Sequence, residues 1–345
     1  MTCRVAAVDC GTNSLRLLVA DLDPGRAELT DVIRRMEIVR LGQGVDKTGR
    51  LAPEALARTM AVLRDYAGVI VGSGAQAVRM VATSATRDAG NAAEFVWMVK
   101  EVLGVAPEVL TGDEEAVLSF TGATAELAAG PDTGPFLVAD IGGGSTEFVL
   151  GLPRGDDPPQ TPPAIFPGGT HPTGPPLGRA VRPPRPPGPS AISVNVGCVR
   201  ITERRLHGDP PADQEVAAAV ADIDAALDTV AAAVPVREAR TLIGLAGSVT
   251  TVAAIAMGLP AYDAARIHHA RASAADVHAV TRGLLAQTRA ERAAIGVMHP
   301  GRVDVIGGGA LILDRLMQRF GFGEVLVSEH DILDGMAWSL AGTRG

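Results

Sequence analysis

The chain has 345 residues, of which 47% are hydrophobic and only 3% aromatic, so its length allows two domains whose cores must be built mainly from Ala, Val, Leu and Ile. A formal net charge of −8 disfavours a general nucleic-acid binder, and we expect no DNA partner. The three cysteines show no paired spacing, which is typical of a reduced interior. The sequence also has no leader-like start and no run of about 18 apolar residues, so we expect a cytoplasmic protein with no membrane partner.

The first third of the chain alternates short apolar runs with amphipathic segments. Apolar residues recur at helical spacing from Leu56 to Ala67, after a proline at position 53 that suits a first helical turn. Strands are predicted over 78–82 and 106–110, with a helix over 92–103 between them. This alternation predicts an α/β domain with a mixed or parallel sheet.

The middle of the chain changes in composition. Residues 153–189 are too rich in Pro and Gly to hold a helix or a sheet ladder, and they are predicted to form a disordered insertion between two strands, leaving the sheet on the side away from any cleft. A proline-rich docking segment is the alternative. A strand is expected to resume at Ala191.

The second half contains several predicted helices. Apolar residues spaced 4,3,4,3,4 predict a long buried helix over 213–234, and Ser273 with Asp276 resembles a capping box. Two further Gly-rich turns are predicted in the segments that start at Leu242 and Val303, each after an apolar run and before a helix.

One motif occurs twice, about 130 residues apart: an apolar run, then Asp-x-Gly-x-x-Ser, then a second apolar run. In such a turn, glycines let backbone N–H groups approach anionic oxygens, hydroxyls add donors, and the Asp can hold a divalent cation or orient a water molecule. Two of these hairpins facing each other would hold a phosphate chain from both sides, in a cleft between two related halves. The two copies comprise Asp9, Gly11 and Ser14, and Asp140, Gly142 and Ser145.

A set of segments in this order resembles the Ppx/GppA family of exopolyphosphatases and guanosine pentaphosphate phosphohydrolases, within the sugar-kinase and actin-like ATPase superfamily. The segments are "DCGTNSLRLLV", "ATSATRDAGN", "LTGDEEAVLSF", "DIGGGSTEFVLG", "VGCVRITERRL", "GSVTTVAA", "RVDVIGGGALIL" and "VSEHDILDG". The resemblance implies an α/β fold of two actin-like, ribonuclease H-like domains with an interdomain cleft. It places the first domain at 1–128 together with a C-terminal helix at about 329–345, and the second, with its insertion, at 129–328.

The resemblance also implies the site residues. Glu115 would be the base that accepts a proton from the attacking water, although acids at a predicted helix start are also explained by the helix dipole, and Glu114 would be a support or cap. Asp140 and Glu147 would bind Mg²⁺, or Mn²⁺ as the alternative, and position the water, with Asp9 as a further metal ligand. The implied phosphate-binding residues are Gly11, Thr12, Asn13, Ser14, Arg16, Arg87, Gly142, Gly143, Gly144, Ser145, Thr146, Gly247 and Ser248.

Two features modify this prediction. The segment "SEHDILDG" lacks the basic residue of the "GLR-x-G"-like run of many relatives, and the chain ends about 10 residues later, which suggests the short two-domain form. The histidines show no catalytic constellation: His207, His278 and His299 have no metal-type spacing, His268 and His269 are adjacent, and His330 is expected to be structural.

The expected function is Mg²⁺-dependent removal of the terminal phosphate from inorganic polyphosphate, from pppGpp, or from both. Alternatives are an ATP-dependent kinase of the superfamily, an actin-like nucleotide-binding or filament protein, and a non-catalytic polyphosphate or alarmone sensor. The "EEA" segment favours activation of water over activation of a substrate hydroxyl. A homodimer is a further expectation, taken from the relatives.

Overall fold

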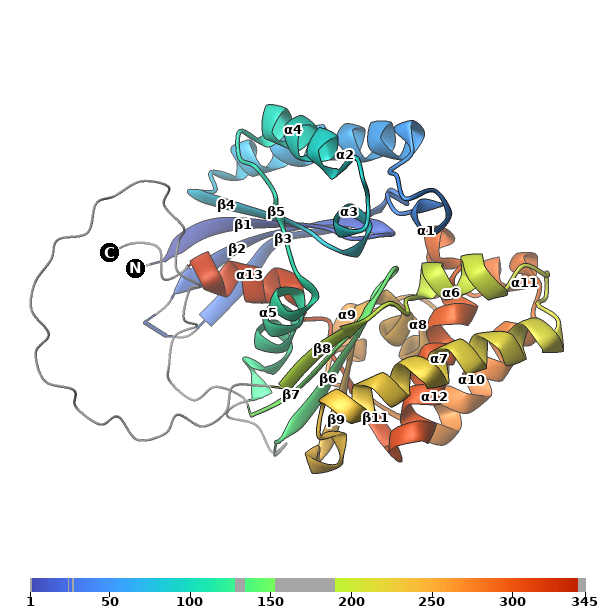
Figure 1. The fold of residues 1–345 in the computed structure, drawn as a ribbon. Helices are drawn as coiled ribbons and strands as arrows, with labels where there is room; N and C mark the ends of the chain where they lie inside the picture. The colour runs from blue at the N-terminus through green and yellow to red at the C-terminus, as the bar shows by residue number, and fades with distance from the viewer. Residues whose placement is uncertain (1, 24, 27, 128–133, 153–189, 341–345) are drawn as a thin grey trace, which may run out of the picture.

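The computed structural model describes residues 2–23, 25–26, 28–127, 134–152 and 190–340, in which two mixed β-sheets are each covered by helices (Figure 1). The first sheet has the order β3-β2-β1-β4-β5 and the second the order β10-β11-β9-β6-β7-β8. The first sheet contains β1 (Cys3–Cys10), β2 (Ser14–Asp23), β3 (Glu28–Ile38), β4 (Ala77–Ala82) and β5 (Glu108–Val109); the second contains β6 (Phe136–Ile141), β7 (Thr146–Gly151), β8 (Ser190–Val194), β9 (Thr241–Leu245), β10 (Arg271–Ser273) and β11 (Glu324–Val327).

The two sheets share one topology. In the first, β1 pairs antiparallel with β2, β2 pairs antiparallel with β3, and β4 is added parallel to β1 on the other side. In the second, β6, β7, β8 and β9 repeat this pattern in the same sequence order. The repeated Asp-x-Gly-x-x-Ser motif therefore marks the same β-hairpin in two related halves, as predicted. The domain boundaries themselves stay predictions, and the expected insertion at 153–189 lies outside the described residues.

Helices cover both faces of each sheet (Figure 1). Helices α2 and α4 pack on one face of the first sheet and α13 on the other; α5 packs on one face of the second sheet, and α7, α8, α10 and α12 pack on the opposite face. The longer helices are α2 (Pro53–Ser73), α4 (Ala92–Leu103), α5 (Gly112–Thr124), α7 (Asp213–Ala233), α8 (Ala246–Ala256), α10 (Ala274–Ala286), α12 (Ile306–Phe320) and α13 (Ile332–Ser339). The shorter ones are α1 (Val45–Thr48), α3 (Ser84–Arg87), α6 (Cys198–Arg205), α9 (Ala264–Ile267) and α11 (Arg289–Ala293).

Most predicted elements are confirmed. Helix α2 begins at Pro53, α4 has the predicted bounds, and α7 ends one residue before the predicted 234. Ser273 caps α10 by accepting a hydrogen bond from the backbone N–H of Asp276 at 3.1 Å. The strand expected over 106–110 shortens to β5, which pairs with β4 through two residues only.

The Gly-rich turn predicted in the segment from Val303 is wrong. The three glycines at 307–309 lie inside the first turns of α12. A β-carbon on Gly308 would lie 2.8 Å from Thr202 Oγ1, and one on Gly309 would lie 2.1 Å from Ser248 Oγ. Close packing against α6 and α8 therefore selects glycine here, in place of a turn conformation.

Helices α5 and α13 lie between the sheets and cross in backbone contact. A β-carbon on Gly122 of α5 would lie 1.8 Å from the carbonyl oxygen of Asp331, and one on Gly335 of α13 would lie 2.1 Å from the carbonyl oxygen of Leu118. Only glycine permits this approach on either helix. The crossing brings a helix of the second sheet directly against a helix of the first. None of the helices in the described part of the chain combines the length and apolar character needed to cross a membrane.

Candidate active site

The two repeated hairpins have the same register, but the first carries a pair of unlike charges where the second carries a pair of like charges. In the first, Asp9 lies directly across from Arg16, and the guanidinium donates to Asp9 Oδ2 from Nη2 at 2.7 Å. In the second, Asp140 lies directly across from Glu147. Residues directly opposite in an antiparallel pair share one face of the sheet, where unlike charges stabilise and like charges destabilise. The second hairpin therefore carries two buried carboxylates side by side.

Each carboxylate of this pair has one hydroxyl donor. Ser119 Oγ donates to Asp140 Oδ2 at 2.7 Å, and Ser193 Oγ donates to Glu147 Oε1 at 2.7 Å. Burial, with the nearby Asp331 carboxylate, raises the pKa of Asp140 to about 6. Burial, with Asp140 as the neighbouring charge, raises the pKa of Glu147 to about 7. Both groups therefore resist ionisation unless positive charge is brought to them.

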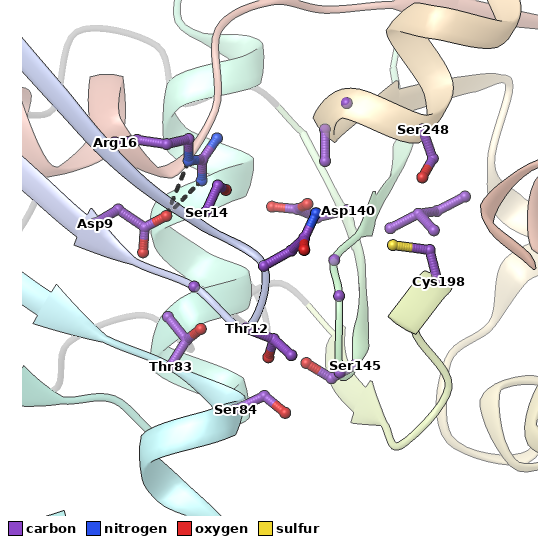
Figure 2. Close-up of a pocket in the computed structure, with 18 of the residues that line it drawn as sticks. Asp9, Thr12, Ser14, Arg16, Thr83, Ser84, Asp140, Ser145, Cys198 and Ser248 are labelled. Atoms are coloured by element: carbon purple, nitrogen blue, oxygen red, sulfur yellow. Dashed lines mark hydrogen bonds and ion pairs between the residues drawn. The ribbon is translucent and has the colours of Figure 1, made fainter. Parts of the chain in front are cut away.

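The turns of the two hairpins touch each other. A β-carbon on Gly143 would lie 2.9 Å from Thr12 Cβ, and one on Gly144 would lie 2.9 Å from Thr12 Oγ1, so glycine is what allows this contact. Figure 2 shows the turn that carries Thr12 facing the turn that carries Ser145. The two hairpins therefore face each other where the two halves meet, as the repeated motif predicts.

The carbonyl oxygens of both turns are held by other backbone groups. Thr12 accepts from the N–H of Gly42, and Asn13 accepts from the N–H groups that follow β3. Gly142 and Gly143 accept from N–H groups in the first turn of α6. Two of the turn amides are also used within the turns, since Gly11 donates to the Ser14 carbonyl oxygen and Gly142 to that of Asp140. Amides that have no such partner are the groups that glycine-rich turns use to bind anions.

Two adjacent glutamates at the start of α5 have different roles. Thr111 and Glu114 form a capping box, in which Glu114 Oε2 accepts from the Thr111 backbone N–H at 2.9 Å. Glu114 is thus the cap, and it is exposed, whereas Glu115 is buried and lines the cavity between the hairpins. Arg87 Nη1 donates to Glu115 Oε2 at 3.1 Å and to the carbonyl oxygen of Leu110 at 2.9 Å. Burial, with the Glu147 carboxylate as a further cause, raises the pKa of Glu115 well above its ordinary value.

Arg16 connects the first hairpin to α13. Its guanidinium binds Asp9 and also forms a short ion pair with Asp331, whose Oδ1 accepts from the backbone N–H of Leu333 at the start of α13. Asp9 keeps one oxygen, Oδ1, buried without a hydrogen-bond partner among the described residues. Since a buried carboxylate oxygen normally has a partner, this atom is available to bind a cation or a water molecule.

Most of the predicted site residues line one cavity of about 110 Å³ between the hairpins (Figure 2). Three do not line it: Glu147 and Arg87 lie behind the lining residues Asp140 and Glu115, and Thr146 donates to the Val196 carbonyl oxygen at 2.5 Å. The predicted residues that line the cavity are Asp9, Gly11, Thr12, Asn13, Ser14, Arg16, Glu115, Asp140, Gly142, Gly143, Gly144, Ser145, Gly247 and Ser248.

Sequence analysis missed Arg302, which lines the cavity beside the start of α8. Its guanidinium lies against Gly247, where a β-carbon would be 2.3 Å away, and Nη1 donates to Thr251 Oγ1 at 3.1 Å. No carboxylate pairs with it among the described residues, unlike Arg16 and Arg87. Ala246, at the same helix start, adopts a φ of 69°, a strained conformation that recurs at functional sites.

Comparison with known proteins agrees with this geometry. The family model described as "Ppx/GppA phosphatase family" matches residues 18–156 and 188–343. The chain belongs to the Ppx/GppA phosphatase family. It is 49% identical to Exopolyphosphatase 2 of Mycobacterium tuberculosis over 350 residues, covering 98% of this chain and 99% of that protein.

Solved structures of Ppx/GppA proteins share the fold. An exopolyphosphatase-like protein superposes with a TM-score of 0.83 at 40% identity, covering 97% of each chain. The Ppx/GppA family member from Aquifex aeolicus superposes with a TM-score of 0.72 at 26% identity, covering 100% of each chain. The expected actin-like two-domain architecture is therefore confirmed.

The buried acids predict how the stability of this Ppx/GppA protein depends on pH when no divalent cation is bound. The folded-state pKa values of Asp140 and Glu147 lie above their ordinary values, so the folded protein holds more protons than the unfolded chain. This contribution to stability is present below about pH 4 and is lost as the pH rises to about 7, on the order of 6 kcal/mol for the pair.

Thermal unfolding in EDTA at pH 5 and pH 8 measures this effect. The wild-type protein should lose more stability over this interval than Glu147→Gln, in which the like-charge pair is removed. An equal pH dependence in the two proteins would contradict the assignment.

Proposed function

We propose that the chain is a divalent-cation-dependent phosphohydrolase that removes the terminal phosphate of inorganic polyphosphate. One observation carries the proposal: two glycine-rich turns meet at a cavity lined by the buried carboxylate of Asp140, and the buried carboxylate of Glu147 lies directly across the hairpin from it. The name of the Mycobacterium tuberculosis relative supports polyphosphate as the substrate.

The residues around this pair fit a bound Mg²⁺ ion. Carboxylate oxygens are the ligands that Mg²⁺ prefers, and the unpartnered Oδ1 of Asp9 supplies a further one. Asp9, Asp140 and Glu147 would therefore hold the ion, directly or through water. When bound, Mg²⁺ would neutralise charge on the phosphate oxygens and lower the pKa values of these acids.

The chain's own groups would then perform the hydrolysis. Amide groups of the two turns, with Arg302, would hold the terminal phosphate, and Glu115 would accept a proton from the water that attacks phosphorus. The bond between phosphorus and the bridging oxygen breaks, and the shortened polyphosphate leaves with that oxygen. Glu115 is able to act as base only when ionised, which Arg87 and the positive charge of a bound cation both favour.

A neighbouring cavity favours pppGpp as a second substrate to test. It has a volume of about 430 Å³, shares Arg16 and Arg302 with the active-site cavity, and is also lined by Tyr262, Met298 and Leu333. Apolar and aromatic side chains suit a nucleoside better than a bare phosphate chain.

We further propose a cytoplasmic setting, since Cys3, Cys10 and Cys198 are all free thiols. A homodimer stays a prediction from the relatives.

Phosphate release from long-chain polyphosphate, short-chain polyphosphate, pppGpp and ATP, each with Mg²⁺ and with EDTA, tests the proposal. We expect Mg²⁺-dependent release from polyphosphate, with ATP slow. Rapid ATP turnover would favour the kinase or actin-like alternative. Binding of polyphosphate or pppGpp without release by a folded protein would favour the sensor.

A further inference from the structure

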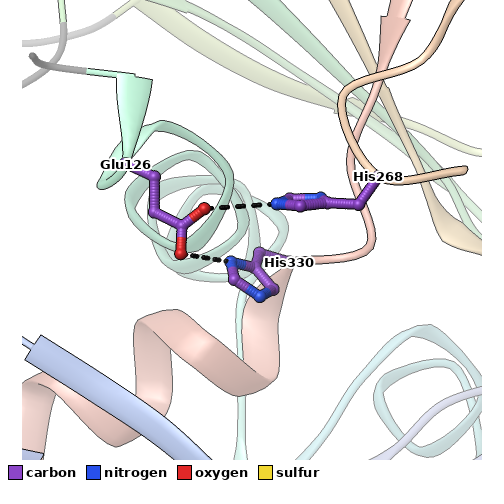
Figure 3. Close-up of side chains that lie close together, drawn as sticks. All are labelled: Glu126, His268 and His330. Atoms are coloured by element: carbon purple, nitrogen blue, oxygen red, sulfur yellow. Dashed lines mark hydrogen bonds and ion pairs between the residues drawn. The ribbon is translucent and has the colours of Figure 1, made fainter. Parts of the chain in front are cut away.

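Three side chains of metal-ligating type converge outside the active-site cavity. Glu126 follows the end of α5, His268 follows α9, and His330 lies just before α13. Figure 3 shows both imidazole rings directed at the one carboxylate. His268 Nε2 lies 3.2 Å from Glu126 Oε2, and His330 Nδ1 lies 3.4 Å from Glu126 Oε1. One ligand atom from each of the three lies within 4.8 Å of the other two.

With one ligand atom from each residue inside 4.8 Å of the other two, the three side chains are close enough to share one metal ion. Atoms bound to tetrahedral zinc at 2.0–2.1 Å lie about 3.3 Å apart. The contact between His330 and Glu126 at 3.4 Å is, by contrast, longer than an N–H···O hydrogen bond normally is. Side-chain exposures of 52% for Glu126, 20% for His268 and 26% for His330 leave room for an ion to enter and for water to complete its coordination.

We propose that Glu126, His268 and His330 form a binding site for a zinc-type transition-metal ion, separate from the Mg²⁺ site of the proposed function. Two imidazole nitrogens and one carboxylate oxygen suit Zn²⁺, Co²⁺ or Ni²⁺, whereas Mg²⁺ prefers oxygen ligands alone. None of the three side chains lines the active-site cavity. Their sequence positions are far apart, which is why no spacing pattern in the sequence predicts the site.

The metal-free form has a hydrogen bond that metal binding must change. His268 Nδ1 accepts from the backbone N–H of Glu329 at 3.1 Å, so the neutral ring carries its proton on Nε2 and donates it to Glu126. When a metal ion binds Nε2, the neutral ring must carry its proton on Nδ1 instead. The Nδ1–H of His268 would then face the backbone N–H of Glu329. The backbone at Glu329 must therefore shift when the site fills, and the tautomer of His268 must switch.

Zinc titration of the full-length protein by calorimetry, in excess Mg²⁺ to fill the oxygen-ligand site, tests this inference. We expect one equivalent of Zn²⁺ to bind wild-type protein, and at least tenfold weaker binding in His330→Ala and in Glu126→Ala. His207→Ala is the matched control, because His207 is also an exposed histidine but lies in the segment after α6, and this variant should bind as wild type does.

Nitrogen-15 NMR of the histidine rings provides a second readout. His268 should change from the Nε2–H to the Nδ1–H tautomer on addition of Zn²⁺, which a purely structural role for the cluster would not produce. Absence of zinc binding in excess Mg²⁺, or equal binding by wild type and both cluster variants, would overturn the proposal. Unfolding curves of the two variants will show which of them is folded, and one folded variant is sufficient for the comparison.

Discussion

Glu115→Gln is expected to lower polyphosphate turnover by about 10²–10⁴-fold, the range over which a positioned general base contributes. Glutamine has the shape of glutamate but cannot accept the proton of the attacking water. Folding should be retained, because the substitution removes a buried carboxylate whose pKa burial and Glu147 have raised. Polyphosphate binding should also persist, since the turn amides and Arg302 are unchanged. Steady-state phosphate release, with equilibrium binding of polyphosphate, measures both effects.

The adjacent Glu114 provides the control for this prediction. Glu114→Gln changes an exposed residue of the same type, one position away, whose carboxylate only caps α5. We expect it to cost at most about 1 kcal/mol of stability and to leave turnover near wild type. If Glu115→Gln keeps near-normal turnover, or if the two variants lose activity equally, Glu115 is not the base.

Arg16→Ala is expected to lower the free energy of unfolding by about 3 kcal/mol and to abolish turnover. Its guanidinium is 20% exposed and is the cation paired with Asp9 and Asp331, so its removal leaves two buried carboxylates without that partner. Removing one member of a buried ion pair costs about 3–5 kcal/mol, and partial exposure of Arg16 favours the lower end. Denaturant unfolding in EDTA measures the loss without a contribution from bound cation.

Arg205→Ala is the matched control for Arg16. Arg205 also binds one aspartate through two nitrogens, at 2.7 Å and 3.0 Å, but its side chain is 43% exposed and lies on α6. An exposed pair of this kind contributes about 1 kcal/mol or less. Equal stability losses in the two variants would show that the Asp9–Arg16–Asp331 network is no stronger than a surface ion pair.

The sequence predicted the two β-hairpins of this site better than the contacts between residues far apart in the chain. The repeated motif located both hairpins, because hairpin formation depends on neighbouring residues, and the i+7 spacing that pairs Asp9 with Arg16 also pairs Asp140 with Glu147. The like-charge pair was therefore readable from spacing once the register was assumed. Arg302 was not, since it reaches the cavity only through its packing on Gly247, 55 positions earlier.

The wrong turn in α12 has a related cause. A run of three glycines is typical of a turn when only the local sequence is considered. In the folded protein, contacts with Ser248 and Thr202 from two other helices decide the conformation, and no local pattern reports them. The cluster of Glu126, His268 and His330 could not be predicted for the same reason: its members are far apart in the sequence and meet only through the tertiary fold.

The glycine crossing of α5 and α13 links the position of Glu115, the proposed base, to two glycines that take no part in the proposed reaction. The carbonyl oxygen of Asp331 packs closely against Gly122, and its carboxylate forms an ion pair with Arg16 of the first hairpin. Glu115 lies on the same helix, seven residues and about 10 Å before Gly122. The distance between Glu115 and the first hairpin therefore depends on the contact between these two helix backbones. Random mutagenesis should therefore find inactive variants at these glycines, among proteins whose every polar site residue is intact.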